Sequence, residues 1–83
     1  MINVYSVFDE KVKAFGPIFE GKTDGAVIRS CTDTANDATL QFGKHPGDFV
    51  LYRIATFDDE KGQFVNITPP ERLVSFSSLV TKK

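Results

Sequence analysis

The chain has 83 residues, which is the length of a single domain (residues 1–83). Hydrophobic residues make up 41% of it and charged residues 25%, a composition that is typical of globular proteins and excludes intrinsic disorder. The net charge of −1 and the pI of about 5.7 lack the basic excess that is usual in nucleic-acid-binding domains.

Cys31 is the single cysteine, so an internal disulfide is excluded and a reducing, cytoplasmic compartment is the simplest interpretation. The N-terminal residues lack the basic and apolar segments of a signal peptide, and none is therefore expected. The apolar stretches are also too short to span a membrane.

Residues 2–8 are mainly β-branched and aromatic, which predicts a strand. Its alternation places Ile2, Val4 and Phe8 on one face and Tyr5 and Val7 on the other. Residues 11–23 are expected to form an ordered, extended loop, because Gly16-Pro17 would break a helix. Three apolar side chains of this loop are expected to be buried: Phe15, Ile18 and Phe19.

Residues 24–36 have the spacing of a helix capped by Thr23 or Asp24. Arg29 and Asp33 are four residues apart on its polar side and are expected to form an ion pair. The apolar stripe consists of small and medium side chains, which predicts a helix lying close on a sheet: Val27, Ile28, Cys31, Ala35 and Ala38.

Turn-forming residues predict a loop over 37–48, and residues 49–57 form the clearest strand of the chain. The polar segment 58–62 ends in Gly62, which suits a positive φ angle, and residues 63–68 return as the partner strand of a hairpin.

Thr68-Pro69-Pro70-Glu71 has the pattern of a helix-capping box, which favours a short helix over residues 72–80. The spacing of Val74, Phe76 and Val80 also fits a strand. The elements together predict an α+β domain, a small antiparallel sheet with one or two helices on one face. An OB-like open β-barrel is the alternative if residues 11–20 and 72–80 are both strands. The last residues, 81–83, are expected to fray.

The sequence does not favour an enzyme, a metal site or a cofactor. Cys31 lies on the apolar side of its helix, where a thiol is inert, so a Cys31–His45 pair is disfavoured. One histidine and one cysteine are too few for a zinc site. Asp58-Asp59-Glu60 is better interpreted as a solvated turn than as a cation site.

The strand 49–57 is mostly apolar on both sides, with Arg53 in the middle of one side. Three interpretations remain open: a homodimer interface, a platform on which bases stack beside a phosphate-binding arginine, or an edge position for Arg53. The face in question has five residues: Phe49, Leu51, Arg53, Ala55 and Phe57.

The segment 41–46 places Phe42 beside Lys44 and His45, with Gly43 between the ring and the lysine. Aromatic rings and cations are the groups that hold single-stranded nucleic acid. A plain connecting loop, with Phe42 packed into the core, is the structural alternative.

Four motifs give the chain a resemblance to a known family. They are Tyr5-Ser6-Val7-Phe8-Asp9 with Lys13-Ala14-Phe15, Ala26-x-x-Arg29-x-x-x-Asp33-x-x-Asn36-Asp37, Gln41-Phe42-Gly43-Lys44-His45-Pro46-x-Asp48-Phe49, and Phe57-Asp58-Asp59-x-x-Gly62. In their order and spacing, from about residue 3 to residue 80, the chain resembles the small non-structural DNA-binding protein of gokushovirus-type microviruses, bacteriophages with single-stranded DNA.

This resemblance implies a non-catalytic protein of the bacterial host cytoplasm that binds DNA late in genome replication. Such a protein would favour synthesis of single strands for packaging. The rival hypothesis is an adaptor that binds the phage replication initiator or procapsid proteins without touching DNA. Residue types give the expected DNA site, Arg29, Phe42, Lys44, His45, Phe49 and Arg53, and an expected homodimer interface at Leu51 and Phe57.

Overall fold

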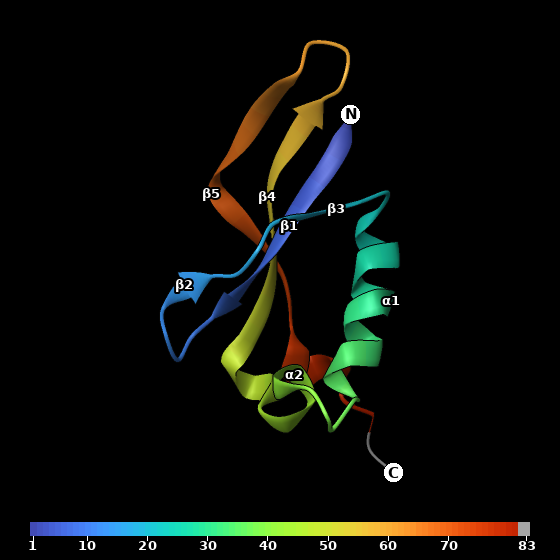
Figure 1. The fold of residues 1–83 in the computed structure, drawn as a ribbon, viewed down its shortest axis with the longest axis vertical. Helices are drawn as coiled ribbons and strands as arrows, with labels where there is room; N and C mark the ends of the chain where they lie inside the picture. Colours follow the sequence, from blue (N-terminus) through green and yellow to red (C-terminus); the bar gives the residue numbers. More distant parts are fainter. Residues whose placement is uncertain (82–83) are drawn as a thin grey trace.

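The computed structural model describes residues 1–81 as an antiparallel sheet curled into a half-barrel, with one main helix. The strands follow the order β2-β1-β4-β5, and β3 pairs with β1 beside β2 (Figure 1). The predicted α+β class is therefore confirmed, and the sheet does not close into a barrel. The elements are β1 (Ile2–Asp9), β2 (Ala14–Phe15), β3 (Phe19–Gly21), α1 (Asp24–Ala35), α2 (Gln41–Lys44), η1 (Pro46–Asp48), β4 (Phe49–Asp58), β5 (Gln63–Ser75) and η2 (Phe76–Leu79).

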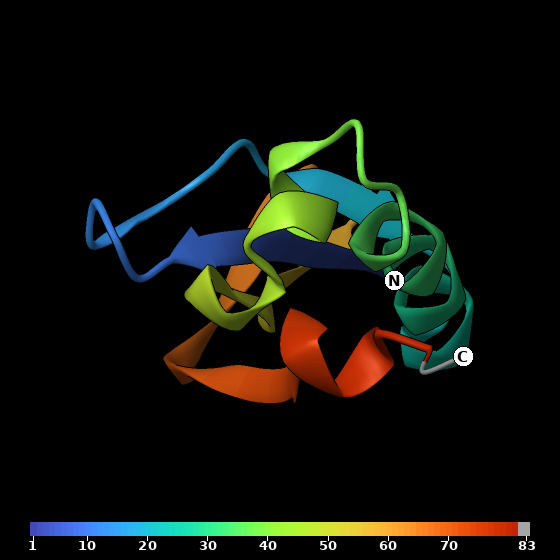
Figure 2. The same ribbon diagram turned by 90° about the horizontal axis from the view of Figure 1, so that it is seen from below.

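Strand β1 lies inside the sheet, and its alternation defines the two faces. Tyr5 and Val7 belong to the inner face, where they meet the main core. Val4 and Phe8 point to the opposite, outer face, because successive side chains of a strand alternate. The predicted division of this strand into two faces is confirmed. Figure 2 shows α1 at one side of the sheet, with β2 reaching out at the other.

Helix α1 forms as the spacing predicts. Thr23 is its N-cap, and the Thr23 hydroxyl accepts a hydrogen bond from the Ala26 amide at 3.1 Å. The apolar stripe packs on the inner face, but Ala38 is exposed because the helix ends at Ala35. The expected ion pair does not form, since Arg29 and Asp33 do not approach within 4.0 Å.

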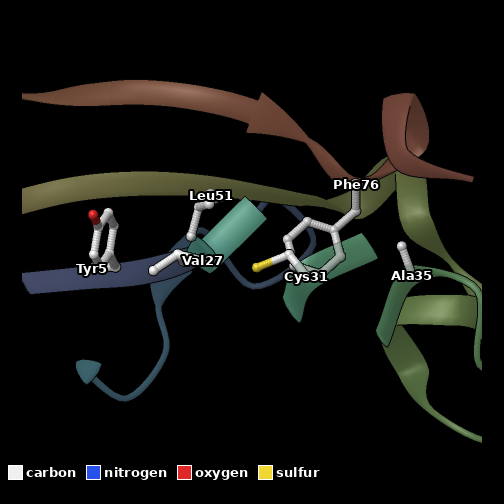
Figure 3. Packing of buried hydrophobic residues seen from close by; sticks show 6 residues of the cluster. All are labelled: Tyr5, Val27, Cys31, Ala35, Leu51 and Phe76. Carbon is white, nitrogen blue, oxygen red and sulfur yellow. The ribbon is translucent and has the colours of Figure 1, made fainter. Parts of the chain in front are cut away.

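The main core joins the inner face to α1 and to η2 (Figure 3). Tyr5 and Leu51 are fully buried, and Phe76 closes the cluster from the C-terminal side. Asn36, just after α1, holds that side in place: its amide donates to the Leu79 carbonyl at 2.9 Å. The buried residues are Tyr5, Val27, Cys31, Ala35, Leu51 and Phe76.

The segment 11–23 differs from its prediction. It forms two short strands on the free side of β1, joined through Gly16-Pro17, in place of an irregular loop. Its apolar side chains are not buried: Phe15 is 43% exposed, Ile18 59% and Phe19 38%. The reason is that this segment lies at the edge of the sheet and pairs only with β1. Its side chains pack against the sheet on one side and face solvent on the other.

The segment 37–48 contains two helical turns, α2 and η1, where an irregular loop was predicted. Gly43 makes the close approach of α2 to the preceding turn possible. A Cβ atom at this position would overlap the Asp37 carbonyl group.

The hairpin prediction is confirmed, with Gly62 at a φ of 67° and its amide bound to the Asp58 carbonyl. The predicted helix over 72–80 is wrong. Strand β5 runs through Pro69 and Pro70 to Ser75, and only Phe76–Leu79 form a 3-10 turn. Pairing with β4 overrides the capping pattern. Expected fraying at Lys82 and Lys83 lies outside the described residues.

A β-bulge at Ile54 changes the expected faces of β4. Tyr5 pairs with Arg53 and its neighbour Val4 pairs with Ala55, so one residue of β4 is skipped. Because adjacent β1 residues point to opposite faces, Arg53 and Ala55 do so as well. The single face predicted from Phe49 to Phe57 is therefore wrong: its first three members are inner and its last two are outer.

Candidate nucleic-acid interface

The outer face carries a cluster of three aromatic rings. Phe8 and Phe15 are opposite each other on β1 and β2, with ring centroids 4.9 Å apart. The Tyr52 ring, from β4, lies 5.3 Å from Phe15 and 6.3 Å from Phe8, edge-on to both. We call Phe8, Phe15 and Tyr52 the outer aromatic cluster. It is separate from the main core, and within residues 1–81 the helices pack on the other face.

The cluster lies over a small buried layer of the outer face. Ser6 is fully buried there, and its hydroxyl donates to the Gly16 carbonyl at 2.8 Å. Val4 and Val50 are also buried, at 5% and 3% exposed. The rings therefore pack on a layer of buried side chains, while Phe15 itself is 43% exposed.

One cationic residue lies on the face of the outer aromatic cluster, and a second precedes β2 in the chain. Arg72 of β5 is the direct partner of Tyr52 of β4, and paired residues share a face. Arg72 is exposed and forms no ion pair with another residue of the described chain. Lys13, exposed at the start of the β1–β2 edge, immediately precedes β2 with a φ of 56°. Aromatic surface and the cation of Arg72 thus occur together on this face.

The predicted stacking residues Phe42 and Phe49 have a structural role. Their ring centroids are 4.7 Å apart, and the Phe42 ring lies 5.3 Å from that of Phe76 in the main core. Both are half-buried against this core. The structural alternative for Phe42, packing into the core, is the arrangement that the fold adopts.

The structure brings His45 to a groove that Phe42 and Phe49 also line. Lys11 contributes one more cation to this groove, but Asp9 and Asp48 line it as well. These carboxylates offset the attraction of the groove for phosphate. Lys44 is exposed at the end of α2, and it is not one of the groove-lining residues.

Arg53 is held by two carboxylates. Its guanidinium binds both oxygens of Glu71 at 3.2 Å and lies 3.8 Å from Asp24. The Tyr5 hydroxyl donates to the same Asp24 carboxylate at 2.7 Å. Burial, and then this acceptor and its charge, raise the pKa of Tyr5 to about 12. Arg53 thus links β4 to β5 and α1.

The other predicted residues are scattered. Arg29 is exposed on α1, which packs on the inner side of the sheet. Leu51, expected at a dimer interface, is fully buried in the main core and has no surface to offer a partner. Phe57, the second expected interface residue, lies on the outer face with its ring centroid 4.9 Å from that of the exposed Phe64.

An apolar groove opens on the inner side, between α1 and the edge formed by β3. Small side chains of α1 line it, among them Ala26 and Ser30, together with Phe19 and Cys31. Burial raises the pKa of the Cys31 thiol to about 11, which keeps it protonated at neutral pH. Within residues 1–81, no group of three or more potential metal-ligating side chains comes together.

Sequence reasoning missed the outer aromatic cluster. Its rings come from three strands, and Phe15 was assigned to the core. A signal was available in part: the strands that carry Phe8 and Tyr52 have apolar residues on both faces, and helices on one side of a sheet cover only one of these faces.

The comparisons with known proteins place the chain in a phage family. The family model described as Phage ORF5 protein matches residues 2–79. No curated protein and no solved structure matches the chain. No helix of the described residues is long and apolar enough to cross a membrane. A match over nearly the whole length is decisive for membership: the chain belongs to the Phage ORF5 protein family.

Proposed function

We propose that this bacteriophage protein binds single-stranded DNA through the outer face of its sheet, without catalysis, in late genome replication and packaging in the host cytoplasm. The observation that supports this best is the outer aromatic cluster, with Arg72 opposite Tyr52 on the same face. Unpaired bases stack on aromatic rings, and cations beside the rings bind the backbone.

The open strand face suits a single strand better than a duplex. Bases of a single strand are free to stack on Phe15, the most exposed ring of the cluster. In a duplex the bases are stacked on each other, and separating them costs free energy that reduces the affinity. Membership of a phage family supports a role in the phage cycle.

The net charge of the protein determines how tightly it should bind DNA and how strongly salt should weaken that binding. With a net charge of −1, few counterions are released on binding, so affinity for one copy should be modest and depend weakly on salt. Stacking on the rings then provides a larger share of the binding free energy than phosphate contacts do, about 1–3 kcal/mol for each stacked base.

The test is fluorescence anisotropy of a labelled strand of about 30 nucleotides, and of the matching duplex, at several salt concentrations. We expect tighter binding of the single strand. Phe15→Ala should weaken it at least about 10-fold, because one stacking surface is lost. Arg72→Glu should weaken binding and reduce its salt dependence by about one ion.

Arg29→Glu is the matched control for Arg72→Glu. It makes the same change of charge on an exposed residue, but on α1. Binding that is lost in the Arg29 variant and kept in the Arg72 variant would move the DNA site to the helical side. No binding of the wild type at low salt would contradict direct DNA binding altogether.

The apolar groove beside α1 favours a second candidate, an adaptor that captures a phage replication or procapsid protein. Its lining by Phe19, Val27 and Phe42 offers a site for an apolar side chain of a partner. Ser30→Arg, at the rim of this groove, should abolish capture of such a partner and leave DNA binding intact. Under the DNA hypothesis, Phe15→Ala should weaken DNA binding and leave the capture of a partner protein intact.

A further inference from the structure

A pocket of about 310 Å³ opens on the outer face, at the end of the sheet opposite to the outer aromatic cluster. Ile2 and Val4 of β1 lie at its base, and Val4 is only 5% exposed. Strands β3 and β4 flank β1, so Glu20 of β3 lines one side of the pocket and Phe57 lines the other, together with Phe64 of β5. The volume is at the lower end of the range for small-molecule pockets, about 300–1,000 Å³, and suits one flat ring.

The aromatic side of the pocket is accessible from solvent. The ring centroids of Phe57 and Phe64 are 4.9 Å apart, with the ring planes inclined by 57°. Phe64 is 57% exposed, which is more than Phe15 of the outer aromatic cluster, and Ile18 beside the pocket is 59% exposed. Exposed apolar side chains around a hollow are typical of a binding site.

Glu20 adds a hydrogen-bond acceptor to these apolar walls. It pairs with Val4 across the strands, and paired residues share a face. Its carboxylate forms no ion pair with another residue of 1–81. An ionised carboxylate only accepts hydrogen bonds, so a ligand must offer an N–H or O–H group to bind it. A flat ring that carries an amino group can stack on the phenyl rings and donate to Glu20 at the same time.

A cationic residue lies beside the pocket. Lys22 follows β3 and lines a second hollow, which shares Ile2 and Glu20 with the first. Lys22 is exposed, and in the described part of the chain its side chain has no carboxylate within 4.0 Å. Its ammonium group is therefore available to a phosphate that is attached to a ring in the pocket.

The pocket is on the same face as the outer aromatic cluster. Ile2 and Phe8 stand near opposite ends of β1, and the rise of a strand separates them by roughly 20 Å. Small β domains that bind single-stranded nucleic acid cover about 4–16 nucleotides. One DNA strand that runs along β1 can therefore reach the outer aromatic cluster and the pocket together.

We propose that this pocket binds one unpaired base, and that Glu20 selects a base with an exocyclic amino group, such as cytosine, over uracil or thymine. The inference rests on the proposed binding of single-stranded DNA and adds a base preference to it. The base stacks on Phe64, its amino group donates to Glu20, and Lys22 binds a neighbouring phosphate. Uracil and thymine have a carbonyl oxygen in place of the amino group, and the carboxylate repels this oxygen.

The first test compares two strands of about 10 nucleotides, one of deoxycytidine and one of deoxyuridine, by fluorescence anisotropy in slightly alkaline buffer. The bases have the same size, and only cytosine carries the amino group. We expect the wild type to bind the cytosine strand at least about 5-fold more tightly. Glu20→Gln should reduce this ratio to within about 2-fold, because an amide can donate as well as accept. Glu60→Gln removes a charge from the nearby hairpin turn and should leave the ratio unchanged.

A second pair of variants tests the aromatic side of the pocket. Phe64→Ala should weaken the binding of both strands at least about 5-fold, because a stacking surface is lost. Val65→Ala is the matched control: Val65 is 52% exposed, but it adjoins Phe64 on the same strand and so points to the other face. It should leave both affinities unchanged. Circular dichroism verifies that the variants are folded, which is expected because both side chains are exposed.

Nuclear magnetic resonance with small probes tests the pocket separately from the outer aromatic cluster. Deoxycytidine monophosphate should shift the backbone amide signals of Glu20 and Phe64. Deoxyuridine monophosphate should shift them less at the same concentration, and arginine amide should leave them in place. Shifts with arginine amide and none with deoxycytidine monophosphate would assign the pocket to a cationic side chain of a partner protein and overturn the proposal.

The remaining outcomes separate this inference from the proposed function. Equal affinities of the wild type for the two strands would overturn base selection by Glu20. Full affinity of Phe64→Ala beside weak binding by Phe15→Ala would overturn the pocket and leave DNA binding at the outer aromatic cluster intact. A wild type that binds neither strand, at any salt concentration, would overturn both.

Discussion

The guanidinium of Arg53 on β4 binds both carboxylate oxygens of Glu71 on β5, at 3.2 Å each. The two residues are paired across the strands, and the pair lies at the end of the irregular stretch that contains Pro69 and Pro70. Glu71 belongs to the segment whose sequence resembles a helix cap. The ion pair uses its carboxylate for a contact between strands instead.

Glu71→Gln should lower the free energy of unfolding by about 1 kcal/mol. The pair is partly exposed, with side-chain exposures of 28% and 46%, so its contribution is modest. Loss of the charge leaves Asp24 as the remaining carboxylate beside the guanidinium, whose Nε has no hydrogen-bond partner within residues 1–81. Urea denaturation followed by circular dichroism measures the change. Glu60→Gln, in the exposed turn, is the control; equal stability of the two variants would show that the ion pair contributes nothing.

Tyr5 should make the protein less stable at alkaline pH. Its pKa is raised from 10.0 to about 12 by burial and by the hydrogen bond to Asp24. The folded state therefore holds the phenol proton more tightly than the unfolded chain does. The resulting stability is fully present below pH 10 and is lost as the pH rises from about 10 to about 12, by up to about 2–3 kcal/mol.

Denaturation curves between pH 8 and about 11.5 would measure this loss. Tyr5→Phe cannot ionise, so its stability should fall less steeply over the same range, although it starts lower because the hydrogen bond to Asp24 is missing. Parallel curves for the two proteins would contradict the assignment.

The thiol of Cys31 should react slowly in the folded protein. It is 7% exposed, and burial raises its pKa to about 11, so little thiolate is present at pH 8. A disulfide reagent that forms a coloured product should modify it at least about 100-fold faster in denaturant than in buffer. Equal rates would mean that α1 opens readily from the sheet.

Gly43→Ala should destabilise the fold by about 2 kcal/mol, because the new Cβ would overlap the Asp37 carbonyl and force α2 away from the turn before it. Gly47→Ala is a close control: the added Cβ meets open space, and we expect a change within about 0.5 kcal/mol. Thermal or urea unfolding compares the two. A mild effect at position 43 would indicate that the 37–44 segment adapts easily.

Short sequence patterns were sufficient to predict the elements whose formation depends mainly on neighbouring residues in the chain. Residues 2–8 and 49–57 alternate and are rich in β-branched and aromatic side chains, which favour a strand wherever they lie. Thr23 and the stripe from Val27 to Ala35 specify a helix within one segment. Gly62 marks the hairpin because few other residues adopt a positive φ. The family resemblance came from the same linear patterns, and the match to a phage family agrees with it at that level.

The sequence by itself thus determined that the chain forms an α+β domain with one capped helix and a hairpin, since these depend on neighbours along the chain. Tertiary structure alone decided the bulge at Ile54, the course of β5 through Pro69 and Pro70, and the meeting of Phe8, Phe15 and Tyr52 on the outer face. Each of these depends on the register between strands. That register results from the joint packing of both faces of the sheet, which no single segment encodes.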